Sequence, residues 1–181
     1  FNGDRRLRNF NRANGFAYTK IYDLLKDREG NIWVSADNKL LISPGEKVEI
    51  IHENDKFSFD SIQAITSDAD GYIWFSTKSG LFRYNYTAPE NQNLKKFEVL
   101  KKKNLHIVSL FEDDWGFLWI GTFDDGLYRL NTLNGEVMSF GAKNGLANAN
   151  VISISGHDNK LWLATLGGII SCDIIEDQKI P

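Results

Sequence analysis

Cysteine is nearly absent from this chain of 181 residues, and long apolar runs and an excess of positive charge are absent too. The single cysteine, Cys172, excludes an internal disulfide, and its apolar neighbours predict a small core residue. No run reaches the about 18 apolar residues of a membrane-spanning helix, and no signal peptide opens the chain. Lys plus Arg is 21 and Asp plus Glu is 24, so we expect no direct nucleic-acid binding.

Motifs for metal or nucleophilic chemistry are also missing. The chain has three histidines, His52, His106 and His157, and none stands in an HxxH or HExxH pattern. No CxxC pair and no G-x-S-x-G elbow occurs. The run SDADG at 67–71 resembles part of a calcium loop but lacks its terminal glutamate. The sequence therefore predicts no metal, no cofactor and no catalytic residue.

An internal repeat is the main feature that is present. Four copies are centred on tryptophans spaced 41, 45 and 43 residues apart: Trp33, Trp74, Trp119 and Trp162, within 27–41, 68–82, 113–128 and 156–170. The residue six positions before the tryptophan is an acid in three copies and a glycine in the fourth: Asp27, Asp68, Asp113 and Gly156. The residue three positions before it is a glycine in three copies and an asparagine in the fourth: Gly30, Gly71, Gly116 and Asn159. Since asparagine tolerates a left-handed backbone best after glycine, this pattern predicts a tight turn whose amides the acid binds.

The apolar runs predict four short strands for each unit. In the second strand, the tryptophan and a small residue share one face, and two further apolar residues share the other, as Ile73 and Phe75 do beside Trp74. A two-sheet sandwich would leave one face polar, whereas an inner strand of a propeller blade is covered on both sides. The predicted fold class is therefore all-β, a β-propeller of about four blades with four antiparallel strands each.

We expect residues 1–181 to form one propeller segment. An outer strand of a preceding blade is expected at 5–10, and blades at about 18–51, 60–100, 105–140 and 149–181. The opening strand could complete the last blade and close a four-bladed ring. A piece of a larger ring is favoured, because a small ring forces steep angles between blades, and the opening FNGDRRLRNF is typical of the interior of a longer protein.

The stretch IVSLFEDDWGFLWIGTFDDGLYRLN at 107–131 resembles the two-component regulator propeller repeats, and AITSDADGYIWFSTKSGLFRYN at 64–85 is close to it. The linker FGAKNGLANANVISI at 140–154 fits the family's approach to a blade, and FNRANGFAYTKIYDL at 10–24 is a weaker copy. The fourth copy departs at Gly156 and Asn159, and the first lacks a Gly-Gly-Leu turn.

This resemblance implies a seven-bladed propeller in the periplasmic sensor region of a bacterial hybrid two-component histidine kinase. It implies an oligosaccharide as the ligand and regulation of transcription as the output. The implied partners are the other propeller blades, an immunoglobulin-like domain of the same protein and a second copy in a homodimer. The kinase activity would belong to the parent protein, so the resemblance predicts no enzyme in this segment.

Residues that break the repeat are better candidates for ligand binding than residues that recur in every blade. The loops between the second and third strands and between blades share one face of a propeller. The candidates on that face are Tyr18, Asp37, Asn38, Lys78, His106, Phe123, Asp124, Asp125, Asn148 and Asn150. The rings of Phe123 and Tyr18 could stack on a sugar while carboxylates and amides bind its hydroxyls. Phe123 could equally pack between blades. Trp115, in a turn on the opposite face, is a candidate for a domain or subunit contact or for simple packing.

Two other functions stay open. Streptogramin-type lyases also use propellers, and such an enzyme would need a catalytic base and usually a metal. The segment could also be a structural module that holds a dimer or presents a neighbouring propeller.

Overall fold

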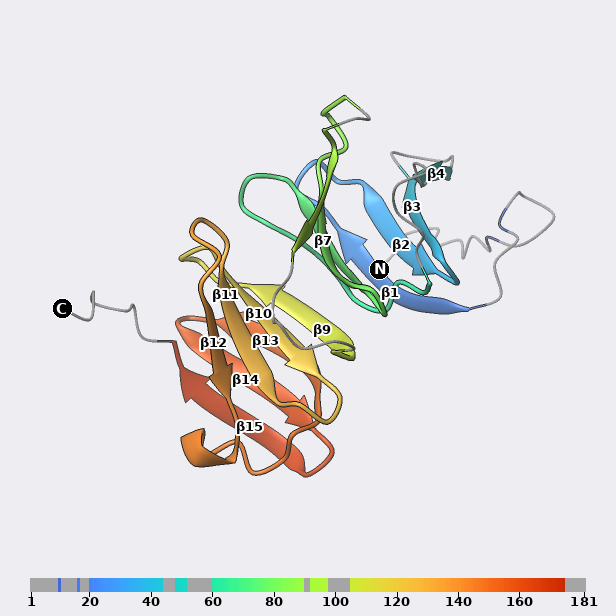
Figure 1. Ribbon diagram of the computed structural model, residues 1–181. Coiled ribbons are helices and arrows are strands. Elements are labelled where there is room, and N and C mark those ends of the chain that lie inside the picture. Colours follow the sequence, from blue (N-terminus) through green and yellow to red (C-terminus); the bar gives the residue numbers. More distant parts are fainter. Residues whose placement is uncertain are drawn as a thin grey trace, which may run out of the picture.

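The computed structural model describes residues 10, 16, 20–43, 48–51, 60–89, 92–97 and 105–174. Within these residues, four antiparallel sheets follow one another along the chain (Figure 1). The first sheet holds β1 (Ile21–Lys26), β2 (Ile32–Ala36), β3 (Lys39–Ser43) and β4 (Glu49–Ile51). The second holds β5 (Ile65–Ser67), β6 (Ile73–Thr77), β7 (Gly80–Tyr84) and β8 (Leu94–Phe97).

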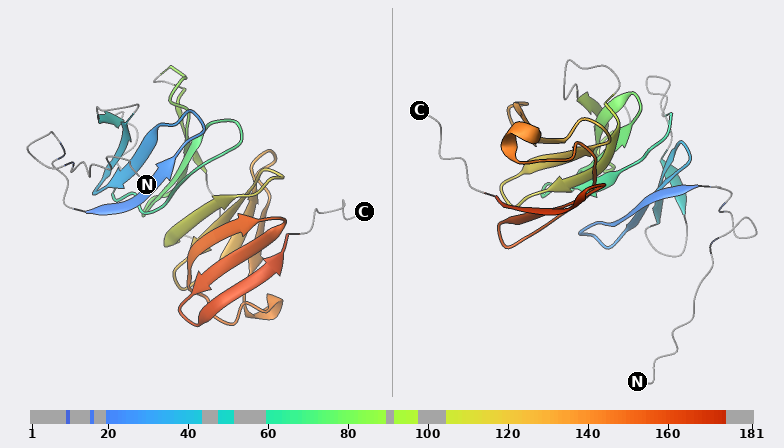
Figure 2. Two further views of the ribbon diagram at one scale, coloured as in Figure 1. Left: turned by 180° about the vertical axis from the view of Figure 1, so that it is seen from behind. Right: turned by 90° about the horizontal axis from the view of Figure 1, so that it is seen from below.

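The third sheet holds β9 (Ile107–Glu112), β10 (Phe117–Thr122), β11 (Leu127–Asn131) and β12 (Val137–Phe140). A short 3-10 helix, η2 (Ala142–Asn144), leads to the fourth sheet, whose described strands are β13 (Val151–His157), β14 (Lys160–Thr165) and β15 (Gly168–Asp173). In every sheet each strand pairs with the next one along the chain. The first strands contact one another from sheet to sheet, β1 with β5, β5 with β9 and β9 with β13. This arrangement confirms the predicted propeller (Figure 2).

Each of the predicted ranges 18–51, 60–100, 105–140 and 149–181 contains one of these sheets. Their ends at 18–19, 98–100 and 175–181 lie outside the described residues, as does the opening strand expected at 5–10 except for Phe10. The exact boundaries therefore stay predictions.

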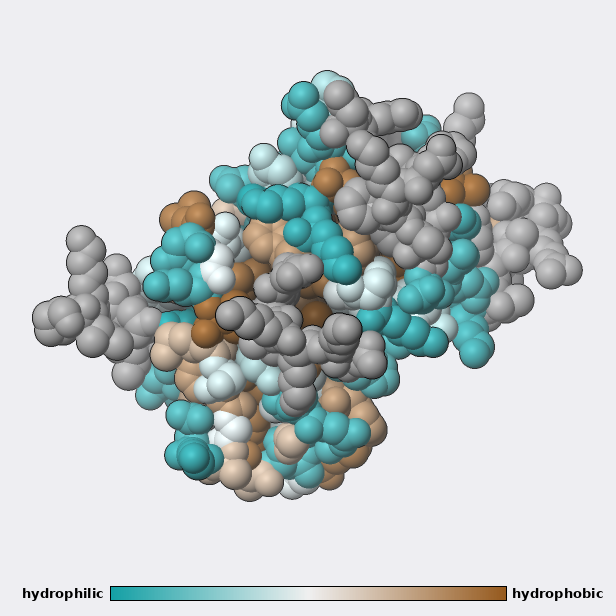
Figure 3. Space-filling view, viewed as in Figure 1, coloured by the Kyte–Doolittle hydropathy of each residue, from teal (hydrophilic) through white to brown (hydrophobic). Residues whose placement is uncertain are grey.

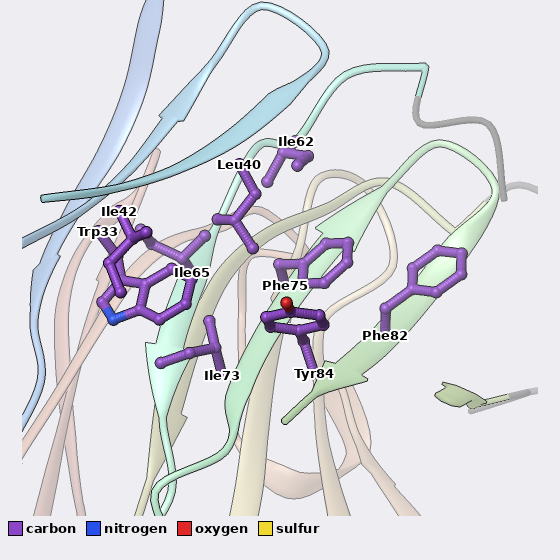
Figure 4. Close-up of a cluster of buried hydrophobic side chains, with 9 residues drawn as sticks. All are labelled: Trp33, Leu40, Ile42, Ile62, Ile65, Ile73, Phe75, Phe82 and Tyr84. Atoms are coloured by element: carbon purple, nitrogen blue, oxygen red, sulfur yellow. The ribbon is translucent and has the colours of Figure 1, made fainter. Parts of the chain in front are cut away.

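The hydrophobic core lies between successive sheets. Trp33, Leu40 and Ile42 of the first sheet point toward six apolar residues of the second sheet and of the segment just before it (Figure 4). These six are Ile62, Ile65, Ile73, Phe75, Phe82 and Tyr84. The opposite face of the second sheet packs with Trp74 against the third sheet, and Trp119 of the third sheet packs against the fourth. All five residues of β6 are buried, because side chains alternate and a sheet covers each face.

The repeated aspartates build the turns before the second strands, as predicted. Asp27, Asp68 and Asp113 each accept the indole N–H of their own tryptophan, at 2.7, 2.8 and 2.8 Å. Their other carboxylate oxygen accepts backbone N–H groups within the same turn. The residues expected to adopt a positive φ do so, including Gly71 at 83° and Asn159 at 60°. These aspartates thus have a structural role, because both oxygens of each carboxylate accept hydrogen bonds from the turn and its tryptophan.

The fourth copy corrects two expectations. Trp162 is 47% exposed, because no described sheet packs against its face of β14. Cys172 is also exposed, since it lies on β15, the outermost described strand of its sheet. Packing explains why Gly156 replaces the aspartate of the other copies, because a Cβ added there would overlap the ring of Phe111 from the third sheet.

Exposed apolar side chains gather on the two outermost sheets. The first sheet exposes Tyr22, Leu24, Ile32 and Ile50, and the fourth exposes Ile152, Trp162 and Ile169. On the face seen in Figure 3, apolar patches lie among hydrophilic residues. No helix among the described residues has the length and apolar character needed to cross a membrane.

Candidate functional site

The loops between the second and third strands have a repeated frame and variable tips. Thr122 donates its hydroxyl to the carbonyl of Gly126 at 2.7 Å, and Thr165 does the same to Gly168 at 2.9 Å. The tips between these anchors are 37–38, 78–79, 123–125 and 166–167. Because these anchoring hydrogen bonds maintain the fold, we expect the variable residues at the loop tips to contact a ligand.

One group of candidates gathers where the third and fourth sheets meet. The backbone N–H of Phe123 donates to the carbonyl of His106 at 2.9 Å, and the two rings lie 5.8 Å apart between centroids. Asn150 Oδ1 accepts the backbone N–H of Asp124 at 3.1 Å, and Asn148 Oδ1 accepts the backbone N–H of Asn150 at 2.8 Å. We call these five residues the Phe123 cluster.

The chemistry of this cluster is that of a polar surface with one apolar ring. Phe123 is 40% exposed, so part of its ring is open to a ligand. The Asp124 carboxylate is exposed, on a residue with φ 74°. The side-chain oxygens of Asn148 and Asn150 accept backbone N–H groups, and their amide nitrogens donate no hydrogen bond within the part of the chain that the structure describes.

Asp125 does not join this surface as a free acid. The buried Tyr128 donates a hydrogen bond to its carboxylate. Burial of the phenol, and then the charge of Asp125 and this bond, raise the pKa of Tyr128 to about 12. Asp125 therefore anchors the loop that presents Phe123 and Asp124.

The first two sheets hold the remaining candidates. Asp37, at φ 49°, accepts the backbone N–H of Lys20 at 3.2 Å and returns its own N–H to the Lys20 carbonyl at 2.9 Å. It thereby fixes the entry to β1. Asn38 and Lys78 are exposed at their loop tips. Tyr18 lies outside the described residues.

Sequence reasoning missed the tip of the fourth loop. Leu166 is exposed, and a Cβ added at Gly167 would lie 3.4 Å from the Cβ of Asn148. This tip therefore lies beside the Phe123 cluster. Alignment of the four loop tips would have found it, because residues 166–167 occupy the position of 123–125 in the repeat.

On the opposite face, Trp115 is half-buried and packs on the cluster between the third and fourth sheets, so the packing interpretation holds. His157 pairs with Asp158 at 3.2 Å, and both side chains are exposed. His52 is not among the described residues. Within the ranges that the structure describes, no group of three or more His, Cys, Asp or Glu could hold a metal ion.

The sheet topology, the packing of each sheet on the next and the loop tips on one face define this chain as a segment of a β-propeller. The sequence profile of the Two component regulator propeller family matches residues 15–38, 56–79 and 101–124. Three stretches of this chain thus match the repeat of that family. No match was found among curated protein sequences.

Solved structures with the same fold include two domains described as extracellular domains of hybrid two component systems from B. thetaiotaomicron. One has a TM-score of 0.72 and 25% identity, covering 88% of this chain and 22% of its own. The other has a TM-score of 0.71 and 18% identity, covering 92% and 25%. Virginiamycin B lyase from Staphylococcus aureus has a TM-score of 0.61 and 18% identity, covering 87% and 57%. The chain thus spans about a quarter of the extracellular domains that it matches.

Proposed function

We propose that this chain is part of the extracytoplasmic sensor propeller of a bacterial two-component histidine kinase, and that its ligand is an oligosaccharide. The repeat family and the similarity to extracellular domains of hybrid two component systems support the sensor. The neighbours' location supports a periplasmic position. Further blades, an immunoglobulin-like domain and a second copy are the partners that such a receptor would have.

The Phe123 cluster is the observation that carries the ligand proposal. Phe123 and Asp124 lie at a loop tip that differs between the copies, and hydrogen bonds hold the cluster together at the junction of two sheets. A half-exposed ring offers an apolar surface for the face of a sugar, and the Asp124 carboxylate and two amide groups offer partners for its hydroxyls. Hydrogen bonds of the Phe123 and Asp124 backbone N–H groups fix the loop that carries the ring and the carboxylate, so less order would be lost on binding.

Calorimetric titration of an oligosaccharide panel into the extracytoplasmic region that contains this chain tests the proposal. The variants Phe123→Ala and Asp124→Ala are compared with Asp114→Ala, an exposed acid in the turn at the other end of the same sheet. We expect one glycan class to bind, with binding lost in the first two variants and kept in the third. Binding that survives in all three would contradict this placement of the site. Failure of the whole panel to bind would contradict the proposal that the ligand is an oligosaccharide.

A lyase is the alternative enzyme, since virginiamycin B lyase shares the fold at 18% identity. His106 is the histidine of the Phe123 cluster, and the contacts described for it are those with Phe123. We propose that it does no acid–base chemistry. If the wild-type protein catalysed an elimination on streptogramin-type substrates and His106→Ala abolished it, this proposal would be wrong.

A purely structural role predicts a different pattern. The extracytoplasmic region would then dimerise in analytical ultracentrifugation, while changes in the Phe123 cluster would alter neither ligand binding nor dimerisation. Loss of binding in Phe123→Ala would contradict a purely structural module.

A further inference from the structure

Ala69, in the turn between β5 and β6, forms hydrogen bonds with both neighbouring sheets on the face opposite the loop tips. Arg28, in the turn between β1 and β2, donates from Nη1 to the carbonyl of Ala69 at 2.8 Å. The backbone N–H of Ala69 donates to Glu112 Oε2, at the end of β9, at 2.6 Å. The first three sheets are therefore joined in a row through Ala69.

The carboxylates of Asp68 and Glu112 both lie near this link, and Asp68 accepts more hydrogen bonds than Glu112 does. Asp68 accepts the indole N–H of Trp74 at 2.8 Å, Nε of Arg83 at 2.8 Å and the backbone N–H groups of Asp70 and Tyr72. Among the residues that the structure describes, Glu112 accepts one hydrogen bond, from Ala69. When two acids share a partly dry site, the one with fewer donors takes up a proton more readily.

The electrostatics of Glu112 agree with this geometry. Burial, and next the charge of Asp68, raise its pKa to about 7 from the ordinary value of 4.5. The hydrogen bond from Ala69 and the charges of Arg28 and Arg83 act in the other direction and are weaker. Glu112 thus changes charge close to neutral pH, unlike an ordinary surface glutamate.

The propeller repeat does not require an acid at this position. The residue directly before the turn is Lys26, Ser67, Glu112 or Ser155 in the four copies. A carboxylate occurs only in the third, where the neighbouring turn offers the Ala69 N–H and places Asp68 nearby. The position is therefore specific to one junction.

We propose that Glu112 is a proton-responsive clamp between the second and third sheets, tightened when the carboxylate takes up a proton from solvent. Protonation removes first the cost of holding a charge in a half-buried place and then the repulsion from Asp68. The carbonyl oxygen of the neutral acid still accepts the Ala69 N–H, and the weaker attraction to this N–H and to Arg28 and Arg83 offsets only part of the gain. Protonation stabilises the folded state, because the unfolded chain binds this proton less tightly. This stabilisation is complete below about pH 4.5 and is lost as the pH rises through about 7.

Denaturant unfolding of the wild-type protein and of Glu112→Gln at pH 5 and pH 8 tests the clamp. Glutamine keeps the oxygen that accepts the Ala69 N–H but cannot titrate. We expect the ratio of the two unfolding equilibrium constants to change by about 10- to 100-fold between the two pH values, with the wild type relatively more stable at pH 5. The exposed Glu49→Gln is the matched control and should leave this ratio constant.

A carbon-13 NMR titration of the Glu112 side-chain carboxyl in the wild-type protein gives a readout that does not depend on any variant folding. A midpoint near 7, accompanied by a shift of the Ala69 amide resonance, supports the clamp. A midpoint near the ordinary glutamate value, or a wild-type to Glu112→Gln ratio that is the same at pH 5 and pH 8, would overturn it.

Discussion

Trp119 and Trp162 occupy the same position in successive repeats, but Trp119 is 4% exposed and Trp162 is 47% exposed. The first sheet shows the same contrast on its other side, where Ile32 is 39% exposed while Ile73 and Leu118 are fully buried. The sequence of a repeat sets which face a side chain joins. Whether that face is dry depends on the neighbouring sheet, so each junction contributes its own share of stability.

The largest expected effect compares a covered tryptophan with an exposed one. Trp74→Ala should lower the free energy of unfolding by about 3–5 kcal/mol, because it leaves a cavity between the second and third sheets. Trp162→Ala should cost about 1 kcal/mol or less, since its ring fills no described core. Urea titration followed by circular dichroism measures both. Equal losses for the two variants would contradict the dependence on neighbours.

A smaller loss is expected from the acid beneath the covered tryptophan. Asp68→Ala removes the acceptor of the Trp74 indole N–H and of Arg83, and it should cost about 2–4 kcal/mol. Asp114→Ala, an exposed acid of the next turn, should change stability by less than about 0.5 kcal/mol. The same titration measures both, and a loss below about 1 kcal/mol for Asp68→Ala would show that the turn does not need its carboxylate.

The smallest of these effects concerns the junction of the third and fourth sheets. Gly156→Ala forces a methyl group into the ring of Phe111 and should cost about 1–3 kcal/mol. Gly141→Ala is the matched control, because nothing lies within 4 Å of its added Cβ and its φ is −147°. Thermal unfolding of the two variants compares them directly. Equal melting temperatures would mean that Phe111 moves aside without cost.

Local patterns explain how much of the fold could be predicted from the sequence. The positive φ of Gly71, the turn formed by Asp68 and the burial of both faces of β6 depend on residues within one repeat, so spacing and alternation predict them. The exposure of Trp162 and the need for Gly156 depend on a different sheet. No pattern within the fourth copy contains that information.

The candidate site was predictable to a similar extent. Departure from the repeat selected His106, Phe123 and Asp124, which the structure brings together with two asparagines. It could not show that Asp125 accepts a hydrogen bond from Tyr128, because strand alternation does not reveal which loop residue a phenol on β11 reaches. The clamp at Glu112 was also beyond reach, since Ala69 lies 43 residues from it and 41 from Arg28.

The exposed tryptophan of the fourth sheet has a spectroscopic consequence. Trp33, Trp74 and Trp119 sit in dry surroundings and should emit at short wavelength, sheltered from iodide. Trp162 should emit further to the red and be quenched readily. With the half-buried Trp115 replaced by Phe, Trp162 is therefore a built-in fluorescent reporter on the outer face of the fourth sheet, and a blue shift with loss of quenching would register whatever comes to cover that face.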